Sequence, residues 1–187
     1  TAAFEVADQL ENKTIDILAL PVGNAGNITA YWKGFKEYNK KSFIDYLPKM
    51  YGFQAKGSAA MVENKVIKNP ETVATAIRIG NPVNRKKAEK AVHQSDGMFK
   101  SVTDQEIKQA HYLLSSKEGV FVEPASATPV AGLIKLAEND QETIKNKRIV
   151  AVLTGNGLKD QEFVLNNYEI PKSVAGNLNS VENILNL

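Results

Sequence analysis

A short stretch rich in glycine and asparagine has the clearest potential for chemistry in this chain. It spans residues 21–27, with the sequence PVGNAGN, and lies between an apolar run at residues 15–20 and a segment at residues 28–39. The apolar run is typical of a buried parallel strand, and the segment that follows has apolar side chains at helical spacing. We therefore expect this loop to join the end of a strand to the start of a helix.

Such a loop is suited to binding a phosphate. Gly23 and Gly26 allow the backbone to turn sharply with its N–H groups pointing the same way, and the helix adds unpaired N–H groups and the positive end of its dipole. Because the loop has no Lys or Arg, backbone amides and the side chains of Asn24, Asn27 and Thr29 would hold the anion. Each charge-assisted hydrogen bond contributes about 1.5–3 kcal/mol. A plain strand-to-helix turn with Asn27 as its N-cap explains the same residues equally well.

Composition and charge exclude several classes of function. The 187 residues are 43% hydrophobic and 24% charged, with a net charge of +2, which is ordinary for one globular domain and gives no electrostatic case for nucleic acid or a membrane surface. The chain has no cysteine, so disulfides, zinc–thiolate sites and a cysteine nucleophile are excluded. No apolar run is long enough to span a membrane, and no metal-binding pattern occurs. We expect a cytoplasmic protein without a metal.

Strand and helix signals alternate along the chain, which favours a parallel sheet with helices on both faces. Thr103 and Glu106 have the spacing of a capping box, and Pro129 is expected in the first turn of its helix. We predict a three-layer α/β fold in a single domain, residues 1–187. The expected strands are residues 15–20, 49–54, 98–102, 119–122 and 148–153, and the expected helices are 3–10, 28–39, 86–93, 103–114 and 128–137.

Ligands of such sheets bind at the carboxyl ends of the strands. Loops with glycine or polar residues follow three of the expected strands, at residues 23–27, 123–127 and 154–157, and we expect them to converge. His93 and His111 lie on expected helices without a partner at the spacing of a catalytic triad or a metal site, so surface or packing roles are expected. Trp32 is expected to belong to the core.

Five segments, in the same order along the chain, resemble the threonine synthase family. Its members are pyridoxal-phosphate enzymes of the tryptophan synthase β structural class, known as fold type II. The resemblance covers about residues 1–160 and implies that the chain is a truncated form of the larger, cofactor-binding domain. The segments are LPVGNAGNITAYWKGFKE (20–37), GFQAKGSA (52–59), ATAIRIGNP (74–82), GVFVEPASATPVAGL (119–133) and VLTGNGLKD (152–160).

This resemblance implies pyridoxal 5'-phosphate as the cofactor and gives roles to particular residues. Thr154 resembles the residue whose hydroxyl faces the pyridine nitrogen, where it can donate to a neutral ring. Residues 79–81, with Gly80 at their centre, resemble a segment beside the ring, and Glu123 resembles a position near it. Ordinary turn or solvated loop residues remain the alternatives for all of these. The implied cofactor-binding residues are Gly23, Asn24, Ala25, Gly26, Asn27 and Thr154.

The resemblance assigns no catalytic residue to this chain. The Schiff-base lysine of the family lies in a Ser-Phe-Lys-Asp type of motif before the phosphate loop, and this sequence has no such motif. The nearest match, residues 42–45, has Ile44 in place of the lysine and follows the loop. The chain also begins without Met, already in a helical pattern. We therefore expect a carboxyl-terminal half whose partner is the amino-terminal half of the same enzyme, and which is inactive alone.

The family reaction converts O-phospho-L-homoserine and water into L-threonine and phosphate. Two alternatives stay open: a serine or threonine dehydratase of the same structural class, and a non-enzymatic α/β module that binds phosphate. A truncated sheet would expose surface that the other half covers, so self-association into a homo-oligomer is also expected.

Overall fold

A four-stranded parallel sheet forms the centre of the computed structural model, which describes residues 1–11, 13–169 and 173–185. The strands lie in the order β3-β2-β1-β4, and Ile17 of β1 pairs with Lys49 of β2 and with Ile149 of β4. The α/β class predicted from the sequence is confirmed. The strands are β1 (Ile17–Pro21), β2 (Lys49–Ala55), β3 (Met98–Val102) and β4 (Ile149–Ala151).

The two central strands are buried on both faces, which explains their continuous apolar character. Every residue of β1 is buried, and so is every residue of β2 after Lys49. Leu18 and Leu20 pack into one hydrophobic cluster, whereas Ile17 and Ala19 pack into another on the opposite face. Burial on both faces is typical of parallel strands covered by helices.

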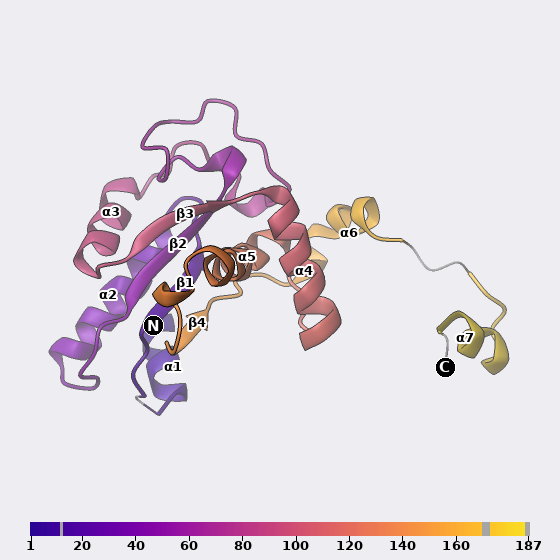
Figure 1. Cartoon of the computed structure of the whole chain (residues 1–187), viewed down its shortest axis with the longest axis horizontal. Helices are drawn as coiled ribbons and strands as arrows, with labels where there is room; N and C mark the ends of the chain where they lie inside the picture. The colour runs from indigo at the N-terminus through magenta and orange to yellow at the C-terminus, as the bar shows by residue number, and fades with distance from the viewer. Residues whose placement is uncertain (12, 170–172, 186–187) are drawn as a thin grey trace.

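Helices α1 (Ala2–Gln9), α2 (Gly26–Lys40) and α3 (Arg85–Gln94) cover one face of the sheet (Figure 1). Trp32 and Phe35 of α2 are buried there, which confirms the expected core role of Trp32.

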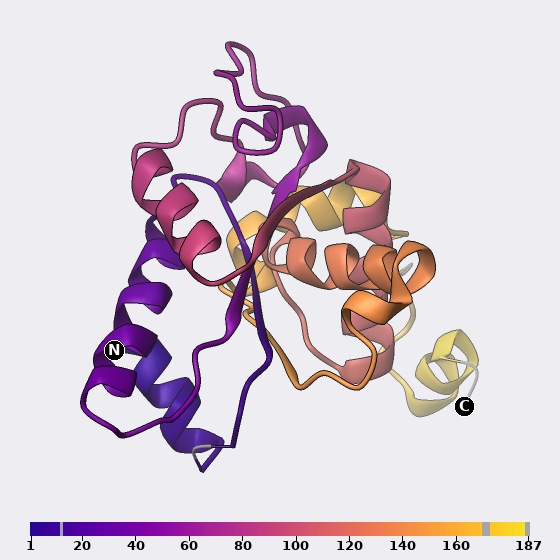
Figure 2. The same ribbon diagram turned by 60° about the vertical axis from the view of Figure 1, so that its left-hand side comes forward.

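Helices α4 (Asp104–Glu118) and α5 (Pro124–Asn139) lie on the other side, so the molecule has three layers (Figure 2). Gly132 of α5 lets the helix approach the ring of Phe53, because a Cβ at this position would occupy the space of that ring. The predicted capping box is confirmed, since the backbone N–H of Glu106 donates to Thr103 Oγ1 and the Glu106 carboxylate accepts from the Thr103 N–H.

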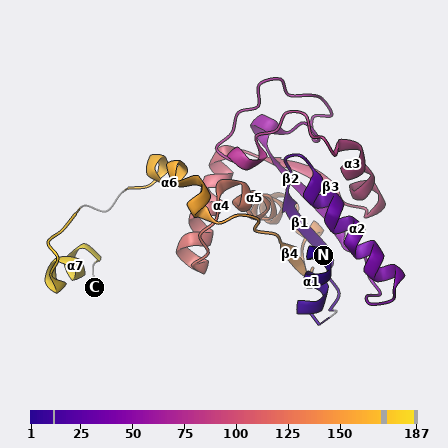
Figure 3. The same cartoon turned by 180° about the vertical axis from the view of Figure 1, so that it is seen from behind.

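The remaining elements are short. Turns of 3₁₀ helix occur at Lys56–Ser58, Thr75–Ile77, Gln141–Thr143 and Gly157–Asp160, and helices α6 (Gln161–Asn167) and α7 (Leu178–Leu185) end the described chain. Helix α7 lies apart from the sheet (Figure 3). Within the described ranges, no helix combines the length and the apolar character that crossing a bilayer requires.

Three details of the predicted elements are wrong. Residues 119–122 form no strand of the sheet, and Val122 makes only an isolated antiparallel bridge to Asn156. Helix α5 begins at Pro124 rather than at residue 128, so Pro129 lies inside the helix and not in its first turn. The strand expected at residues 148–153 is limited to Ile149–Ala151. In each case the local sequence, a short apolar run or a proline, is compatible with more than one secondary structure. Tertiary contacts determine which of these structures forms.

Candidate functional site

The strand order creates a switch point beside β1. The chain runs from β1 outward to β2 and β3, and then returns to β4 on the other side of β1. In open parallel sheets, the crevice at the carboxyl ends of the strands at such a point is the preferred ligand site. A hollow of about 310 Å³ lies there. All six residues that the sequence singled out line it, namely Gly23, Asn24, Ala25, Gly26, Asn27 and Thr154.

The loop after β1 presents backbone amides to this hollow. Ala25 is the N-cap of α2 and has left-handed backbone angles (φ 61°, ψ 16°), and within the described part of the chain no side chain caps this end of the helix. The alternative in which Asn27 is the N-cap is therefore wrong, since Asn27 is the second residue of the helix. The first N–H groups of a helix have no partner within it, and a left-handed residue beside a helical one makes a concave nest for an anion.

Neighbouring residues hold the loop in this strained shape. A left-handed alanine costs about 1–3 kcal/mol, so the surroundings must stabilise it. The N–H of Asn84 donates to the backbone oxygen of Asn24 (3.1 Å). Gly23 lies so close to the next segment that an added Cβ would be 3.1 Å from Ile77 Cα. Contacts with the neighbouring segment therefore hold the loop in this shape.

Thr29 does not have the anion-binding role that the sequence predicted for it. Its hydroxyl donates to the backbone oxygen of Ala25 (2.8 Å), so its one proton is used within the first turn of α2. The expectation that Thr29 holds the anion is wrong. Asn24 and Asn27 are exposed and line the hollow. Asn24 Oδ1 accepts from the Val83 N–H (3.5 Å), so this side chain would contribute its Nδ2 as the donor to an anion.

The expected convergence of the three loops is confirmed. The N–H of Glu123 donates to the oxygen of Gly155 (3.0 Å), and the N–H of Gly157 donates to the oxygen of Phe121 (3.2 Å). These bonds join the segment before α5 to the segment after β4. Both segments contribute to the hollow whose other wall is the loop at residues 23–27.

Glu123 has a larger role in the site than its sequence context suggested. Its side chain is only 8% exposed, and its carboxylate lies 3.2 Å from Lys159 Nζ. It is also the N-cap residue of α5, where the helix dipole favours a negative charge. A solvated loop carboxylate, the alternative weighed for Glu123, is therefore wrong. The ion pair offsets a negative charge that would otherwise repel an anion in the same hollow.

The segment before Gly80 contributes two residues to the hollow that the sequence did not single out. Gly80 does not line the hollow, and its missing Cβ leaves room for the backbone oxygen of Ile67 instead. Ala76 and Ile77 line the hollow, and the position of residues 79–81 beside the cofactor ring stays a prediction. Sequence reasoning missed both of these lining residues, because small or aliphatic side chains carry no chemical signal of their own.

The two histidines lie outside this hollow, as expected. His93 is exposed on α3, whereas His111 is 2% exposed and is packed against Phe121 and Phe163. His111 Nδ1 lies 2.7 Å from Tyr168 Oη. Burial lowers the pKa of the His111 imidazole, although a backbone hydrogen bond to Val122 partly opposes this. These contacts confirm a packing role for His111.

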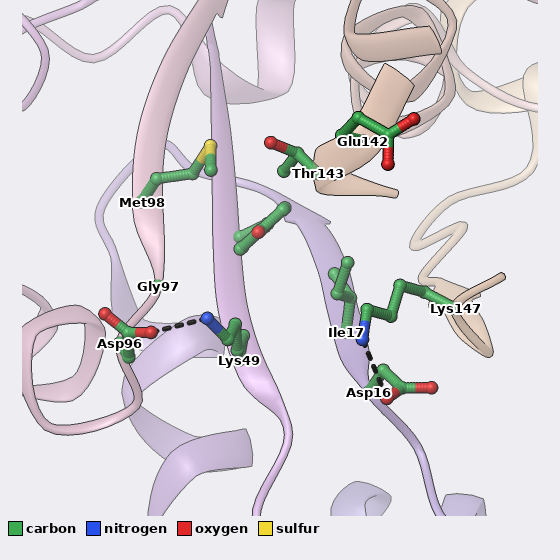
Figure 4. A pocket seen from close by; sticks show the side chains of 10 residues that line it. Asp16, Ile17, Lys49, Asp96, Gly97, Met98, Glu142, Thr143 and Lys147 are labelled. Carbon is green, nitrogen blue, oxygen red and sulfur yellow. Dashed lines mark hydrogen bonds and ion pairs between the residues drawn. The ribbon is translucent and has the colours of Figure 1, made fainter. Parts of the chain in front are cut away.

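A second hollow, of about 460 Å³, lies near the amino ends of the strands (Figure 4). Its lysines are paired within its own wall, Lys49 with Asp96 and Lys147 with Asp16 (3.9 Å). Both lysines are thus already paired with carboxylates. Ligands of parallel sheets bind at the carboxyl ends of the strands, whereas this hollow lies at the amino ends, so it is a poor site for an anionic ligand.

Comparison with known proteins identifies the family of the chain. A family model described as pyridoxal-phosphate dependent enzyme matches residues 1–155. Threonine synthase of Halalkalibacterium halodurans is 52% identical over 177 residues, covering 95% of this chain and 49% of that protein. Threonine synthase of Methanocaldococcus jannaschii is 49% identical over 193 residues, covering 99% and 47%. The chain thus spans about half the length of these relatives.

Solved structures show the same fold. The processed form of threonine deaminase isoform 2 from Solanum lycopersicum has a TM-score of 0.69 and 22% identity, covering 88% of this chain and 46% of that one. Serine racemase from Dictyostelium discoideum has a TM-score of 0.60 and 22% identity, covering 83% and 47%. The expected fold type II is confirmed. Together with the family match over most of the chain, these likenesses establish that the chain belongs to the pyridoxal-phosphate dependent enzymes.

Proposed function

We propose that this chain supplies the phosphate-binding side of the cofactor site in an enzyme that converts O-phospho-L-homoserine and water into L-threonine and phosphate. The observation that carries the proposal is that the loop at residues 23–27 and Thr154 line one hollow at the switch point of the sheet. The curated relatives at about 50% identity, which are named threonine synthases, give the proposal its reaction.

The residues of the hollow fit pyridoxal phosphate. The cofactor phosphate would accept hydrogen bonds from the backbone amides between Gly23 and Asn27, where the left-handed Ala25 shapes the cradle. The pyridine ring would lie between this loop and the loop after β4, with its nitrogen toward the Thr154 hydroxyl. Among the residues that the structure describes, no lysine or arginine lines this hollow, so we propose that N–H dipoles rather than a cation bind the phosphate.

When bound, the cofactor would serve as the electron sink for carbanions at the α- and β-carbons of the substrate. This chain would bind and orient that group. The amides would anchor the phosphate, and Thr154 would hold the ring nitrogen by a hydrogen bond without protonating it. The pairing of Glu123 with Lys159 would keep the wall of the hollow close to neutral.

The proton-transferring lysine is proposed to come from another stretch of polypeptide. The 187 residues contain no Ser-Phe-Lys-Asp type of motif, and the curated relatives are about twice as long as the stretch that they share with this chain. We assign the lysine to an amino-terminal half of the same enzyme, and we call the two halves together the assembled enzyme. The cytoplasmic location and the homo-oligomeric state stay predictions.

A dehydratase reaction has weaker support. Threonine deaminase and serine racemase share only 22% identity with this chain, whereas the threonine synthases share 49–52%. Likeness at the lower level shows the fold and leaves the chemistry open.

Fragment complementation tests the proposal. The 187-residue chain would be mixed with the amino-terminal half of the Halalkalibacterium halodurans enzyme and pyridoxal phosphate, and each half alone would be the control. We expect phosphate and threonine to form from O-phospho-L-homoserine only in the mixture. Turnover by the 187-residue chain alone, or formation of 2-oxobutanoate from threonine in place of the expected products, would contradict it.

A further inference from the structure

A second hydroxyl lies behind Thr154, on the first turn of α5. Ser126 is the third residue of that helix and is completely buried, and its Oγ lies 3.0 Å from Thr154 Oγ1. Thr154 itself is exposed and lines the hollow. The two hydroxyls therefore form a chain that leads from the protein interior to the proposed cofactor site.

The direction of this chain follows from counting protons. The backbone N–H of Gly155 lies 2.7 Å from Ser126 Oγ, and because an N–H can only donate, Ser126 must accept this bond. A serine hydroxyl has one proton to give. In the part of the chain that the structure describes, Thr154 Oγ1 is the other hydrogen-bond partner of Ser126 Oγ. Leaving a buried O–H proton without an acceptor is costly, so Ser126 donates to Thr154.

We infer that Ser126 is a positioning residue that presets the Thr154 hydroxyl as a donor into the hollow. Since Thr154 Oγ1 already accepts a proton from Ser126, its own proton is free to point toward a ligand. This inference rests on the proposed function, because its consequence concerns the ring nitrogen of the cofactor. A donor at this position selects a neutral pyridine nitrogen. In the reverse order, Thr154 would offer a lone pair and would match a protonated ring.

A nearby charge acts against the selection of a neutral ring nitrogen. The charged residue in the described lining of the hollow is Glu123, and its carboxylate would by itself favour a protonated ring. Its ion pair with Lys159 weakens that field, and the ordered hydroxyls oppose it. Glu123 and Lys159 stay unchanged in every variant of the test below. A shift in the protonation of the ring nitrogen therefore measures the effect of the hydroxyls and not that of the ion pair.

The test reads the ring nitrogen directly. The assembled enzyme would bind 4-deoxypyridoxine 5'-phosphate labelled with ¹⁵N in the ring, an analogue without the aldehyde that reacts with lysines. We expect the ¹⁵N chemical shift of a neutral nitrogen at pH 7. In Ser126→Ala, where Thr154 can turn to accept, we expect the nitrogen to protonate about one pH unit higher and the analogue to bind roughly ten-fold more weakly. Ser126→Cys, with its weaker donor, should shift the nitrogen in the same direction by less.

Two further variants separate positioning from structure. Thr128 is a buried hydroxyl on the same helix that donates to the oxygen of Pro124 (3.3 Å), so Thr128→Val should leave the nitrogen unchanged. In a Thr154→Val background, adding Ser126→Ala should cause no further shift, because Ser126 acts through Thr154. The inference would be overturned if Ser126→Ala left the protonation of the ring nitrogen unchanged, or if it shifted that protonation equally with Thr154 and with Val at position 154. Either result would leave the proposed function standing. Failure of the unaltered enzyme to bind the analogue would overturn the proposed function as well.

Discussion

Substituting Gly26 by alanine should separate the stability of the fold from its affinity for phosphate. Gly26 is the first residue of α2 and has no positive φ, so its backbone accepts an alanine. An added Cβ would have only an ordinary contact, 3.5 Å from Asn84 Nδ2. Because a change from glycine to alanine at a compatible backbone conformation stabilises a protein by about 0.4–1 kcal/mol, chiefly by restricting the unfolded chain, Gly26→Ala should raise the free energy of unfolding by up to about 1 kcal/mol.

The same Cβ should weaken phosphate binding. Gly26 lines the hollow, and a methyl group beside its amide would hold a phosphate away from the amides of the cradle. Losing one charge-assisted hydrogen bond costs about 1.5–3 kcal/mol, which corresponds to a roughly ten- to hundred-fold rise in Kd. The variant should therefore be more stable without ligand and should bind the cofactor less tightly.

Two measurements on the assembled enzyme test this pair of effects. Urea denaturation without ligand gives the free energy of unfolding, and calorimetric titration compares 4-deoxypyridoxine 5'-phosphate with the same compound lacking its phosphate. Gly26→Ala should weaken binding of the phosphorylated compound only. Ala30→Gly, an exposed change on the same helix, is the matched control: it should destabilise the protein by about 1 kcal/mol and leave both affinities unchanged. Unchanged affinity for the phosphorylated compound in Gly26→Ala would refute the placement of the phosphate.

Three further predictions concern stability, each measured by urea denaturation. Ala25→Gly should stabilise the ligand-free protein by about 1 kcal/mol because it relieves a left-handed alanine (φ 61°), and a lower urea midpoint would contradict this. Thr103→Ala should cost about 1 kcal/mol through loss of the capping bond to the Glu106 N–H, and an unchanged midpoint would contradict that role. Burial lowers the pKa of His111 in the folded state, so the unfolded chain binds more protons below about pH 6.5 and stability should fall as the pH drops through that range. His111→Phe should flatten this slope and the exposed change His93→Gln should not, and equal slopes in all three proteins would refute the assignment.

The sequence predicted the site best where one physical rule determined the outcome. Parallel strands place the loops that follow them at one edge of the sheet, so the convergence of the loops at residues 23–27, 123–127 and 154–157 followed from the alternation of elements. The capping box at Thr103 was equally local, because its two partners are three residues apart.

Features that depend on tertiary contacts were not predictable. The left-handed shape of Ala25 depends on the neighbouring segment that contains Ile77 and Asn84, and no local rule assigns such a conformation to alanine. The burial of Glu123 requires a partner, Lys159, that comes much later in the chain. The apolar residues 119–122 resembled a strand, but they face the loop after β4 rather than the edge of the sheet.

A crystal structure of the assembled enzyme with pyridoxal phosphate would test the proposed site most directly, because it would show where the phosphate binds. We expect the phosphate oxygens to accept hydrogen bonds from the backbone amides between Gly23 and Asn27, and the ring nitrogen to face the Thr154 hydroxyl. A phosphate bound at the opposite end of the sheet, beside Lys49 and Lys147, would contradict the proposed site.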